Sequence, residues 1–508
     1  MLQPPSTPSS VADASSALAS PPVWPNGDAL DRKIGKLTGP AILNLLVLPL
    51  VGIVDAIWVG RMKNAQAIAG MQAGNQIFSS TFWIVSFLPT VVAPLIAAAA
   101  ASGDNEKLED ELAQAMLLGL IVGAFGTAAL LVKPRQALSL VVPVDSKVYK
   151  FAAPYVKFRA LSFIPAVLST IGFAAYRGKL DVVTPLKISL VTQLINVVLD
   201  PILIFRMGLG VAGASLATGI AELLSGLTYL ALLTKQGVLK VSKILRVPSW
   251  RRLRPLLVGG FAIQLRALAL NAAFLSVTRR AQSLDATGTM AAAHAITIQL
   301  WQLGGVFLFG LSGVASVLVP SELNDSGRDK SSKDHSNKSS KDSSGSAMSG
   351  VPAGRRIAAR GLANRLLAWG LVAGIALGFA QLGALPLLSL FSPLADVQAA
   401  ARVPSIIGAI LQSINGMVFV GEGIMQGTRS FLRLAAGNAV ATSGMLLALR
   451  TWAKPIAEGG FGLNGVWASF FVFNGIRLVA VAQYHLRDGP LAPRSIAAAA
   501  AAEGGSEE

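Results

Sequence analysis

Cysteine is absent from the 508-residue chain, and its three histidines are far apart. These absences exclude disulfides, thiolate chemistry and metal sites with cysteine ligands. Charged residues are also scarce, at 14% of the chain, whereas 53% of the residues are hydrophobic. With a mean hydropathy of +0.58, the chain is too apolar for an ordinary water-soluble surface. The composition therefore predicts a membrane protein, which has the lipid bilayer as a partner.

Basic residues outnumber acidic ones and give a formal net charge of +17. Such an excess can indicate nucleic-acid binding, but these residues lie in short segments between apolar stretches rather than on one face of a soluble fold. This distribution is typical of the topology signal of a membrane protein. We expect no nucleic-acid partner.

Long apolar stretches recur along the chain, each close to the roughly 20 residues that a helix needs to cross the hydrocarbon core. They lack the alternation of membrane-spanning strands. We therefore expect an all-α membrane protein of about twelve transmembrane helices. The expected spans are 38–60, 66–101, 113–133, 151–176, 182–205 and 211–234, followed by 255–281, 289–320, 357–391, 401–426, 430–452 and 462–486.

An even number of spans places both termini on one side of the membrane. Segments on that side carry roughly twice as many Lys and Arg residues as the other side, so the positive-inside rule places the termini in the cytoplasm, or in the stroma or matrix of an organelle. The basic residues on the side of the termini are Arg32, Lys33 and Lys36, those from Lys235 to Arg254 and from Arg328 to Arg360, and Arg429 with Arg433.

The chain divides into two expected six-helix lobes. Residues 324–349 are rich in Ser, Lys and Asp, and such a tract buries too little apolar surface to become ordered. Residues 1–30 lack Lys and Arg, which favours a disordered tail over a signal or transit peptide. We expect a tail at 1–36, a first lobe at 37–234, a basic linker at 235–254, a second lobe at 255–320 and 356–486, a disordered loop at 321–355 and a C-terminal tail at 487–508.

The two lobes share sequence features at equivalent places. Gly210-Val-Ala-Gly213-Ala-Ser-Leu-Ala-Thr218 in the first lobe corresponds to Gly462-Leu-Asn-Gly465-Val-Trp-Ala-Ser469 in the second. Tyr176-Arg177-Gly178 likewise corresponds to Met425-Gln426-Gly427. Two repeats of even helix number are related by a pseudo-twofold axis along the membrane normal. This arrangement predicts a central cleft between the lobes and transport by alternating access.

Asp55 lies within the first span, in Pro49-Leu-Val-Gly-Ile-Val-Asp55-Ala-Ile-Trp-Val-Gly60. A charge at this depth costs at least a few kcal/mol, and such residues commonly bind protons, ions or substrates. We expect the Asp55 carboxylate to bind a proton or Na⁺. The alternative is a residue near the helix end that reaches water.

Asn196 and Asp200 lie four residues apart in the fifth span and so share one helix face. Pro201 lacks a backbone N–H, which frees a carbonyl nearby as a further oxygen ligand for a cation. With Asp55, these residues predict a coupling-ion site, with Na⁺ as the one metal ion that it would take. The alternative is an interhelical hydrogen-bonded pair at a proline kink.

Four further residues inside the spans are candidates for a substrate or proton site. Glu222 and Glu422 can each be protonated or bind a cation, or can be neutralised by a basic partner in a structural role. Arg266 can be that partner, or can bind an anionic substrate. His294, within Ala292-Ala293-His294-Ala295-Ile296, fits a proton relay, but a packing role is the commoner one for such a histidine.

These motifs resemble the multidrug and toxic compound extrusion (MATE) family, over residues 37–486 apart from the polar tract. The first-span motif ending in Asp55, the Asn196-x-x-Leu-Asp200-Pro motif and Gly210 to Thr218 carry the resemblance, together with Ala-Ala-His294-Ala-Ile. The branch that it most resembles is that of bacterial DNA-damage-inducible protein F and its plant and algal organelle relatives.

The resemblance implies a cation site in the first lobe, made by Asp55 and Asp200 and completed by Asn196 and Thr218. That branch has an Asp-Gly motif in its tenth helix, where this chain has Glu422-Gly423, which retains the charge on a longer side chain. The family's Arg-Gly at the end of that helix is here Gln426-Gly427.

We therefore expect an antiporter that exports a small organic molecule, a cation or an acid, in exchange for H⁺ or Na⁺. It would act as a monomer without other cofactors, in the chloroplast envelope or the plasma membrane. The alternative function is a flippase for lipid-linked oligosaccharides, which would need a more cationic cleft. An enzyme is not expected, because the sequence contains no HExxH motif or nucleophile elbow.

Overall fold

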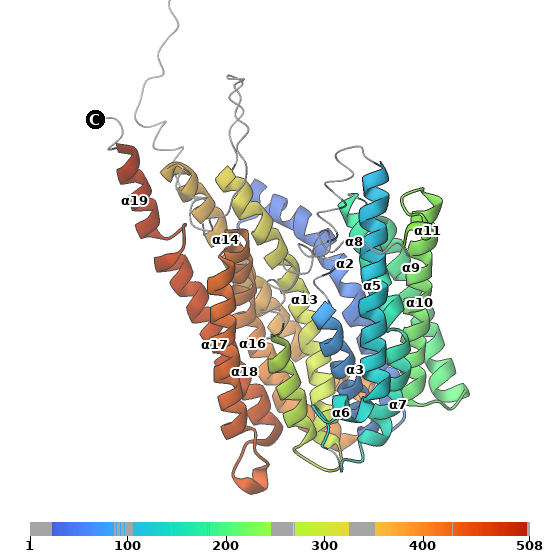
Figure 1. Cartoon of the computed structure of the whole chain (residues 1–508). Helices are drawn as coiled ribbons and strands as arrows, with labels where there is room; N and C mark the ends of the chain where they lie inside the picture. Colours follow the sequence, from blue (N-terminus) through green and yellow to red (C-terminus); the bar gives the residue numbers. More distant parts are fainter. Residues whose placement is uncertain are drawn as a thin grey trace, which may run out of the picture.

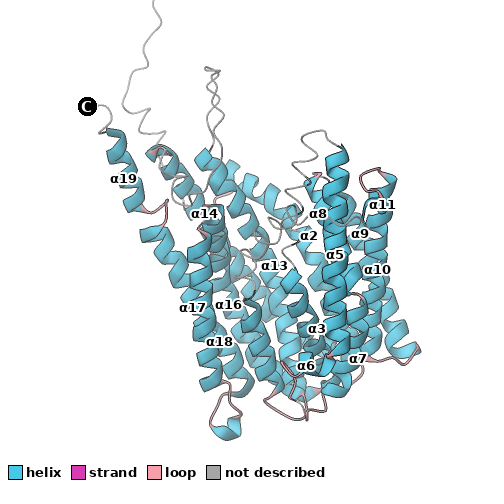
Figure 2. Cartoon of the chain, in the orientation of Figure 1, coloured by secondary structure: helices cyan, strands magenta, loops and turns pink. Residues whose placement is uncertain are grey.

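The computed structural model describes residues 23–85, 105–244, 270–324 and 351–504, except positions 144, 180, 182 and 429, together with positions 88, 92, 96 and 268. These described residues form helices, turns and loops, without strands (Figure 2). The first-lobe helices, blue to green, stand beside the second-lobe helices, yellow to red (Figure 1). An all-α architecture follows because helices satisfy every backbone polar group within the bilayer.

The first lobe contains the helices before residue 245. They are α2 (Ala29–Gly60), α3 (Ala65–Val85), α5 (Asn105–Val132), α6 (Pro134–Leu138), α7 (Tyr149–Leu161), α8 (Phe163–Gly178), α9 (Val183–Pro201), η1 (Ile202–Arg206), α10 (Val211–Lys235) and α11 (Val241–Ile244).

The second lobe contains the helices after residue 269. Residues 270–282 are helical. They are followed by α13 (Thr289–Asn324), α14 (Ala353–Gly383), η2 (Leu385–Leu387), α15 (Leu388–Phe391), α16 (Ala395–Gly427), α17 (Phe431–Trp452), η3 (Ile456–Glu458), α18 (Gly462–Gln483), η4 (Tyr484–Asp488) and α19 (Pro493–Gly504).

Most of the expected spans are long, apolar helices in the structure. Among the described residues, eight helices are long and apolar enough to cross a bilayer, and α7 with α8, bent by 50° at their junction, makes a ninth. The expected span 38–60 corresponds to α2. Of the span 66–101, the structure describes α3 and positions 88, 92 and 96, and most of 255–281 lies outside the described residues. The predicted all-α membrane fold is confirmed.

Glycines allow the closest helix approach inside the second lobe. A Cβ atom at Gly370 of α14 would lie 2.5 Å from the carbonyl oxygen of Gly416 on α16, and a Cβ at Gly416 would lie 1.9 Å from the carbonyl oxygen of Gly370. Both distances are shorter than any real contact. Only glycine at both positions lets these two backbones touch, as small residues commonly do between membrane helices.

The lobes are joined by hydrogen bonds on the side of the membrane opposite the termini. Helix α2 ends and α3 begins on that side, and the helix 270–282 also ends there. Gln282 donates to the carbonyl oxygen of Ala69 at 2.8 Å, and Arg279 donates to that of Ser139 at 2.8 Å. Deeper in the membrane, Ser80 donates to Asn271 at 2.8 Å. The structure is therefore closed between the lobes on the side away from the termini.

Helix α2 connects the two lobes. Near its start, Ile34 packs in one hydrophobic cluster with Ala315 and Leu366 of the second lobe. Near its end, Ala56 and Val59 belong to a cluster that contains residues of both lobes. Helix α2 also packs against α13 of the second lobe and α9 of the first. A shift of α2 therefore affects both lobes at once.

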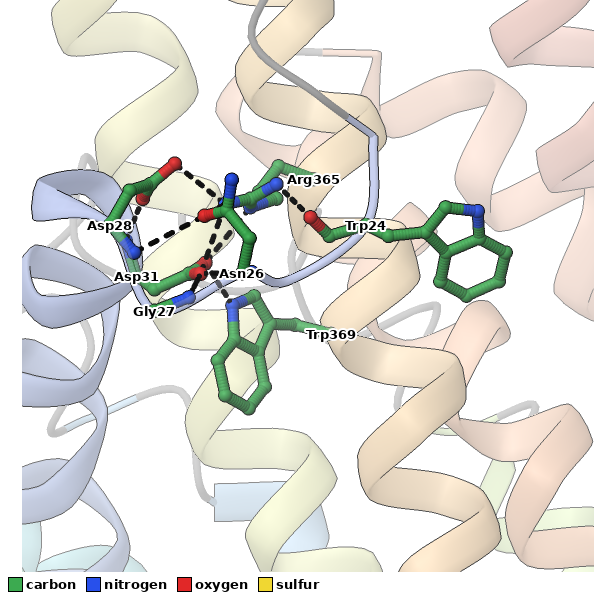
Figure 3. Close-up of polar contacts among 7 residues, drawn as sticks. All are labelled: Trp24, Asn26, Gly27, Asp28, Asp31, Arg365 and Trp369. Carbon is green, nitrogen blue, oxygen red and sulfur yellow. Dashed lines mark hydrogen bonds and ion pairs between the residues drawn. The ribbon is translucent and has the colours of Figure 1, made fainter.

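The disordered tail expected at residues 1–36 is wrong in its C-terminal part, because α2 already begins at Ala29. The fully buried Arg365 of α14 orders this region (Figure 3). Its guanidinium donates to Asp31, to Asp28 at 2.7 Å, to Asn26 at 2.6 Å and to the carbonyl oxygen of Trp24. Residues 1–22 lie outside the described residues.

Three other expected segments differ from the structure. The loop expected at 321–355 is shorter, because α13 continues to Asn324 and α14 starts at Ala353; residues 325–350 lie outside the described residues. The C-terminal tail expected at 487–508 contains helix α19, whose alanine run has high helix propensity. Part of the basic linker expected at 235–254 is helical, as α11, and residues 245–254 lie outside the described residues.

Candidate functional site

Four side chains of the first lobe meet where α2, α9 and α10 pack together. Asp55 comes from α2, Asn196 and Asp200 from α9, and Thr218 from α10. Asn196 and Asp200 are fully buried, and Asp55 is 8% exposed. The four-residue spacing in α9 places Asn196 and Asp200 on the face toward α2 and α10. The structure thus brings together all four residues expected at the ion site.

Few hydrogen bonds hold these side chains. Asn196 Nδ2 donates to Thr218 Oγ1 at 3.3 Å. The Thr218 hydroxyl lies 3.4 Å from Asp55 Oδ2 and 3.0 Å from the carbonyl oxygen of Ala214, so its single proton can serve one of these acceptors at a time. The Asp55 and Asp200 carboxyl groups lie next to each other. The cluster is rich in acceptors and poor in donors.

Four buried acceptor atoms in this cluster have no hydrogen-bond partner among the described residues: Asp55 Oδ1, Asn196 Oδ1 and both carboxylate oxygens of Asp200. A buried acceptor without a donor is costly, and two adjacent carboxylates cannot both remain charged without compensation. A proton between the carboxylates or a hard cation bound by these oxygens would supply that compensation. The described residues contain no group of three or more His, Cys, Asp or Glu side chains that could hold a metal ion.

Pro201 changes the helix directly after Asp200. Because proline has no N–H, the carbonyl oxygen of Val197 loses its usual helical donor. The chain continues as a π-helical turn over Ile202–Arg206, with Met207 N–H donating to the carbonyl oxygen of Ile202 at 2.9 Å. Turns of this kind often occur at functional sites. The sequence motif Asp200-Pro201 therefore coincides with a local irregularity at the acceptor cluster.

The acceptor cluster borders a cavity of about 140 Å³, which we call the ion pocket. Asp55 and Thr218 line it, together with Arg159, Glu222 and Tyr155 of the first lobe. Gln299, from α13 of the second lobe, also lines it. A Cβ atom on Gly52 would lie 3.0 Å from Gln299 Oε1, so glycine at this position makes room for the amide. The ion pocket therefore lies at the boundary between the lobes.

Glu222 is paired with an arginine that the sequence analysis missed. Arg159 Nη2 donates to Glu222 Oε1 at 2.7 Å, and Nη1 donates to Oε2 and, at 2.6 Å, to Ser162 Oγ. The guanidinium carbon lies 3.9 Å from the centre of the Phe78 ring. Arg266, the partner expected from the sequence, lies outside the described residues. The charge of Arg159 within the span 151–176 is the signal that would have identified it.

A second cavity, of about 530 Å³, lies behind the Arg159–Glu222 pair, and we call it the aromatic pocket. Arg159 and Glu222 line both cavities and so stand between them. The other lining residues include rings and hydroxyl groups, and Arg177 lines the pocket near the end of α8 on the side of the termini. The lining rings are those of Phe78, Phe82, Trp83, Phe173 and Tyr229.

Glu422 lies away from these cavities, inside the second lobe. Arg477 Nε donates to Glu422 Oε1 at 2.8 Å, and Asn438 Nδ2 donates to the same oxygen at 3.1 Å. The side chains of Glu422 and Arg477 are 3% and 6% exposed. The adjacent cavity has a volume of only about 10 Å³. This environment favours the structural interpretation of Glu422 over ion or substrate binding.

His294 is also buried in the second lobe, 2% exposed, with its ring 5.9 Å from that of Trp467. It lines neither the ion pocket nor the aromatic pocket. Its neighbours in the chain, Ala293 and Ala295, belong to the packed hydrophobic cluster around Trp467. This placement favours the packing role over the proton relay.

Comparison with known proteins gives one consistent family. Residues 40–202 match the family model described as MatE. "Protein DETOXIFICATION 44, chloroplastic" of Arabidopsis thaliana is 26% identical over 477 residues, which cover 91% of this chain and 83% of that protein. "DNA damage-inducible protein F" of Escherichia coli (strain K12) is 30% identical over 259 residues, which cover 49% of this chain and 54% of that protein.

The fold has a solved counterpart. A structure described as an inward-facing conformation of a multidrug resistance MATE family transporter of the MOP superfamily superposes with a TM-score of 0.73. It is 17% identical in sequence, and the match covers 89% of this chain and 98% of that one. The expected twelve-helix fold is confirmed by this match. The MatE match over residues 40–202 and this shared fold make the chain similar to MATE family membrane transporters.

Proposed function

We propose that this chain is a secondary antiporter that exports a small organic molecule in exchange for H⁺ or Na⁺. The observation that carries the proposal is the group of four buried acceptor atoms of Asp55, Asn196 and Asp200 without a donor, at the boundary between the lobes. The coupling ion binds there, with Thr218 as a further oxygen ligand. The flippase alternative has no support in the comparisons.

The position of Asp55 on α2 links ion binding to the lobes. Without a bound ion, the adjacent carboxylates of Asp55 and Asp200 repel each other and their buried oxygens lack compensation. A proton or Na⁺ removes the repulsion and draws α2 toward α9 and α10. Because α2 also packs against α13 of the second lobe, this shift changes the contact between the lobes. The ion then favours one arrangement of the lobes and the substrate favours the other, which is all that coupling requires.

Opening on the opposite side needs the hydrogen bonds between the lobes to break. They involve neutral side chains, backbone carbonyls and one exposed arginine, Arg279, rather than buried ion pairs. Each such bond contributes only about 0.5–1.5 kcal/mol. A few of them can be exchanged for others when the substrate or ion binds, which suits a transporter that alternates between two states.

We also propose where the transporter acts. The chain is a multi-pass membrane protein, and its relative DETOXIFICATION 44 is described as chloroplastic. The chloroplast envelope is therefore the favoured membrane, with the termini in the stroma, and the protein works there as a monomer. A fluorescent fusion expressed in plant cells tests the choice of membrane, and protease accessibility of the termini in isolated chloroplasts tests their location in the stroma. Labelling of the plasma membrane would contradict the first, and cleavage of both termini in intact envelopes would contradict the second.

The experiment that tests antiport is uptake into proteoliposomes under separately imposed pH and Na⁺ gradients. A labelled organic cation and a labelled carboxylate are compared, with Asp55→Asn and Asp200→Asn as inactive variants. Glu458→Gln, which neutralises an exposed carboxylate in the short helix η3, is the control and should transport as the wild type does. The proposal fails if correctly inserted Asp55→Asn and Asp200→Asn variants transport as fast as the wild type down an imposed gradient.

A further inference from the structure

We propose that the aromatic pocket binds an organic anion that carries an aromatic ring, and that Arg159 holds the carboxylate of this ligand. The inference rests on the proposed function, because it names the substrate class of the same transporter. It departs from the expectation from buried acidic residues alone, which would favour an organic cation.

The lining of the aromatic pocket suits a flat apolar molecule with one polar end. Five rings and several hydroxyl groups surround a cavity of about 530 Å³. Cavities that bind small molecules commonly measure about 300–1,000 Å³ and are lined by apolar side chains with a few polar groups. Phe78 and Phe82 stack at a centroid distance of 6.0 Å, and both rings contact Phe163 behind them. The apolar wall is therefore already packed in place for a ring to bind.

The charges in the aromatic pocket favour an anion. Three charged residues line it, Arg159, Arg177 and Glu222, which together give one net positive charge. Asp55 lines the ion pocket instead. Both carboxylate oxygens of Glu222 already accept hydrogen bonds from Arg159. An incoming cation would therefore meet a neutralised carboxylate and two guanidinium groups.

Arg159 also has an N–H group that makes no hydrogen bond to the described residues. Its side chain is 9% exposed, and its buried Nε has no hydrogen-bond partner among the described residues. Arginine binds carboxylates through two adjacent N–H groups. A ligand carboxylate can accept hydrogen bonds from Nε and from one Nη of Arg159. Glu222 then loses one of the hydrogen bonds that it accepts from Arg159. Glu222 therefore competes with the ligand carboxylate for the Arg159 guanidinium and lowers the affinity for the ligand.

The second lobe contains a similar ion pair, with the acid and the arginine exchanged between the two helices and without a large cavity beside it. Glu422 and Arg477 also form an ion pair between the fourth and sixth helices of their lobe, α16 and α18. Their side chains are 3% and 6% exposed, whereas those of Arg159 and Glu222 are 9% and 22% exposed. The cavity beside the second pair measures about 10 Å³. One pair therefore faces a cavity large enough for a ligand, and the other is packed and serves as a matched control.

The test measures binding to the purified full-length transporter in lipid nanodiscs, without any ion gradient. The probes are 2-naphthoate and 2-naphthylmethylammonium, which share a ring system and differ in charge, and calorimetry gives the Kd of each. We expect 2-naphthoate to bind about tenfold more tightly or better, as one charged hydrogen bond allows. Arg159→Gln should remove this preference, whereas Glu222→Gln should tighten 2-naphthoate binding. The double variant Glu422→Gln with Arg477→Gln should leave the ratio of the two Kd values unchanged.

Tighter binding of 2-naphthylmethylammonium to the wild type would overturn the inference, as would a Glu222→Gln variant with unchanged or weaker 2-naphthoate binding. The Glu222→Gln result decides the question even if Arg159→Gln does not fold, because it retains Arg159. The inference and the proposed function fail separately. Binding of 2-naphthoate without ion-driven uptake would contradict antiport alone, and ion-driven uptake of the ammonium probe would contradict the substrate class alone.

Discussion

Arg365 on α14 donates hydrogen bonds from Nε and Nη2 to the two carboxylate oxygens of Asp31 on α2, each at 2.9 Å (Figure 3). Trp369 Nε1 donates to the same carboxylate at 2.7 Å. This contact holds the start of α2 on the second lobe, whereas Asp55 near its end lies among first-lobe residues. Helix α2 is therefore anchored to the second lobe at its start and carries Asp55, a residue of the proposed ion site, near its end.

Arg365→Gln should destabilise the transporter strongly. The substitution leaves the buried Asp31 carboxylate without its counter-charge, and breaking such a buried pair costs about 3–5 kcal/mol. We expect a clearly lower midpoint of thermal unfolding in detergent. Arg433→Gln removes an exposed arginine that donates to the carbonyl oxygen of Asp488, and should change the midpoint little. Equal midpoints for Arg365→Gln and the wild type would show that the contact contributes no stability.

The contribution of Asp31 should depend on pH in one direction. Burial raises the pKa of Asp31, but hydrogen bonds from Arg365, Trp369 and the backbone N–H groups of Asn26 and Gly27 outweigh it, so the pKa falls well below its usual value. A carboxyl group whose pKa is lower in the folded state stabilises that state at pH values above its unfolded pKa, about 3.9 for Asp. This stabilisation is lost as the pH falls toward the pKa of the folded state. Asp31→Asn should therefore lower the unfolding midpoint equally at pH 8 and pH 6, and less below about pH 4. A difference between wild type and variant that grows on acidification would contradict this sign.

The closed side of the molecule can be tested by cross-linking, because the chain has no native cysteine to remove. The Ser80 hydroxyl and the Asn271 side chain are in contact across the lobes at 2.8 Å. Ser80→Cys with Asn271→Cys, joined by oxidation or a short thiol cross-linker, should abolish transport, and reduction should restore it. Each single variant should remain active under oxidation. Full transport by the cross-linked protein would mean that the lobes do not separate at this contact.

Glu422→Gln should impair folding more than coupling. Glu422 is held by Arg477 and Asn438 in a packed environment, so removing its charge leaves Arg477 buried without a counter-charge. We expect less folded protein and a lower unfolding midpoint, with transport per folded molecule still driven by the same ion. If transport by the folded Glu422→Gln protein no longer depended on the ion, Glu422 would have the role in coupling that the sequence also allowed.

The fold could be predicted from the sequence because the hydrocarbon core imposes a length and a polarity on every span. Three residues of the proposed ion site could also be grouped from the sequence, since Asn196 and Asp200 share a helix face and Asp55 is a lone carboxylate inside an apolar span. Thr218 was reached only through the family resemblance, because a threonine in a membrane helix is commonplace. Its hydroxyl does lie beside Asp55 and Asn196.

The ion pairs could not be assigned from the sequence. Arg159 and Arg477 lie in predicted spans, but which acid each one faces depends on how helices cross. Arg266 was instead suggested as the partner of Glu222 or Glu422. The contact of Asp31 with Arg365 joins residues 334 positions apart, and no local pattern indicates it. The expectation of a disordered tail failed for the same reason, because the partner that orders residues 24–31 is on a distant helix.

Antiport is tested most sharply by measuring ion movement driven by substrate. Proteoliposomes are loaded with a transported substrate, and entry of H⁺ or ²²Na⁺ is followed while the substrate leaves down its own gradient. If the protein is an antiporter coupled at Asp55 and Asp200, one of these ions enters with wild-type protein and Glu458→Gln, and neither enters with Asp55→Asn or Asp200→Asn. Substrate efflux without entry of either ion, or unchanged ion entry in the two aspartate variants, would contradict antiport at this site.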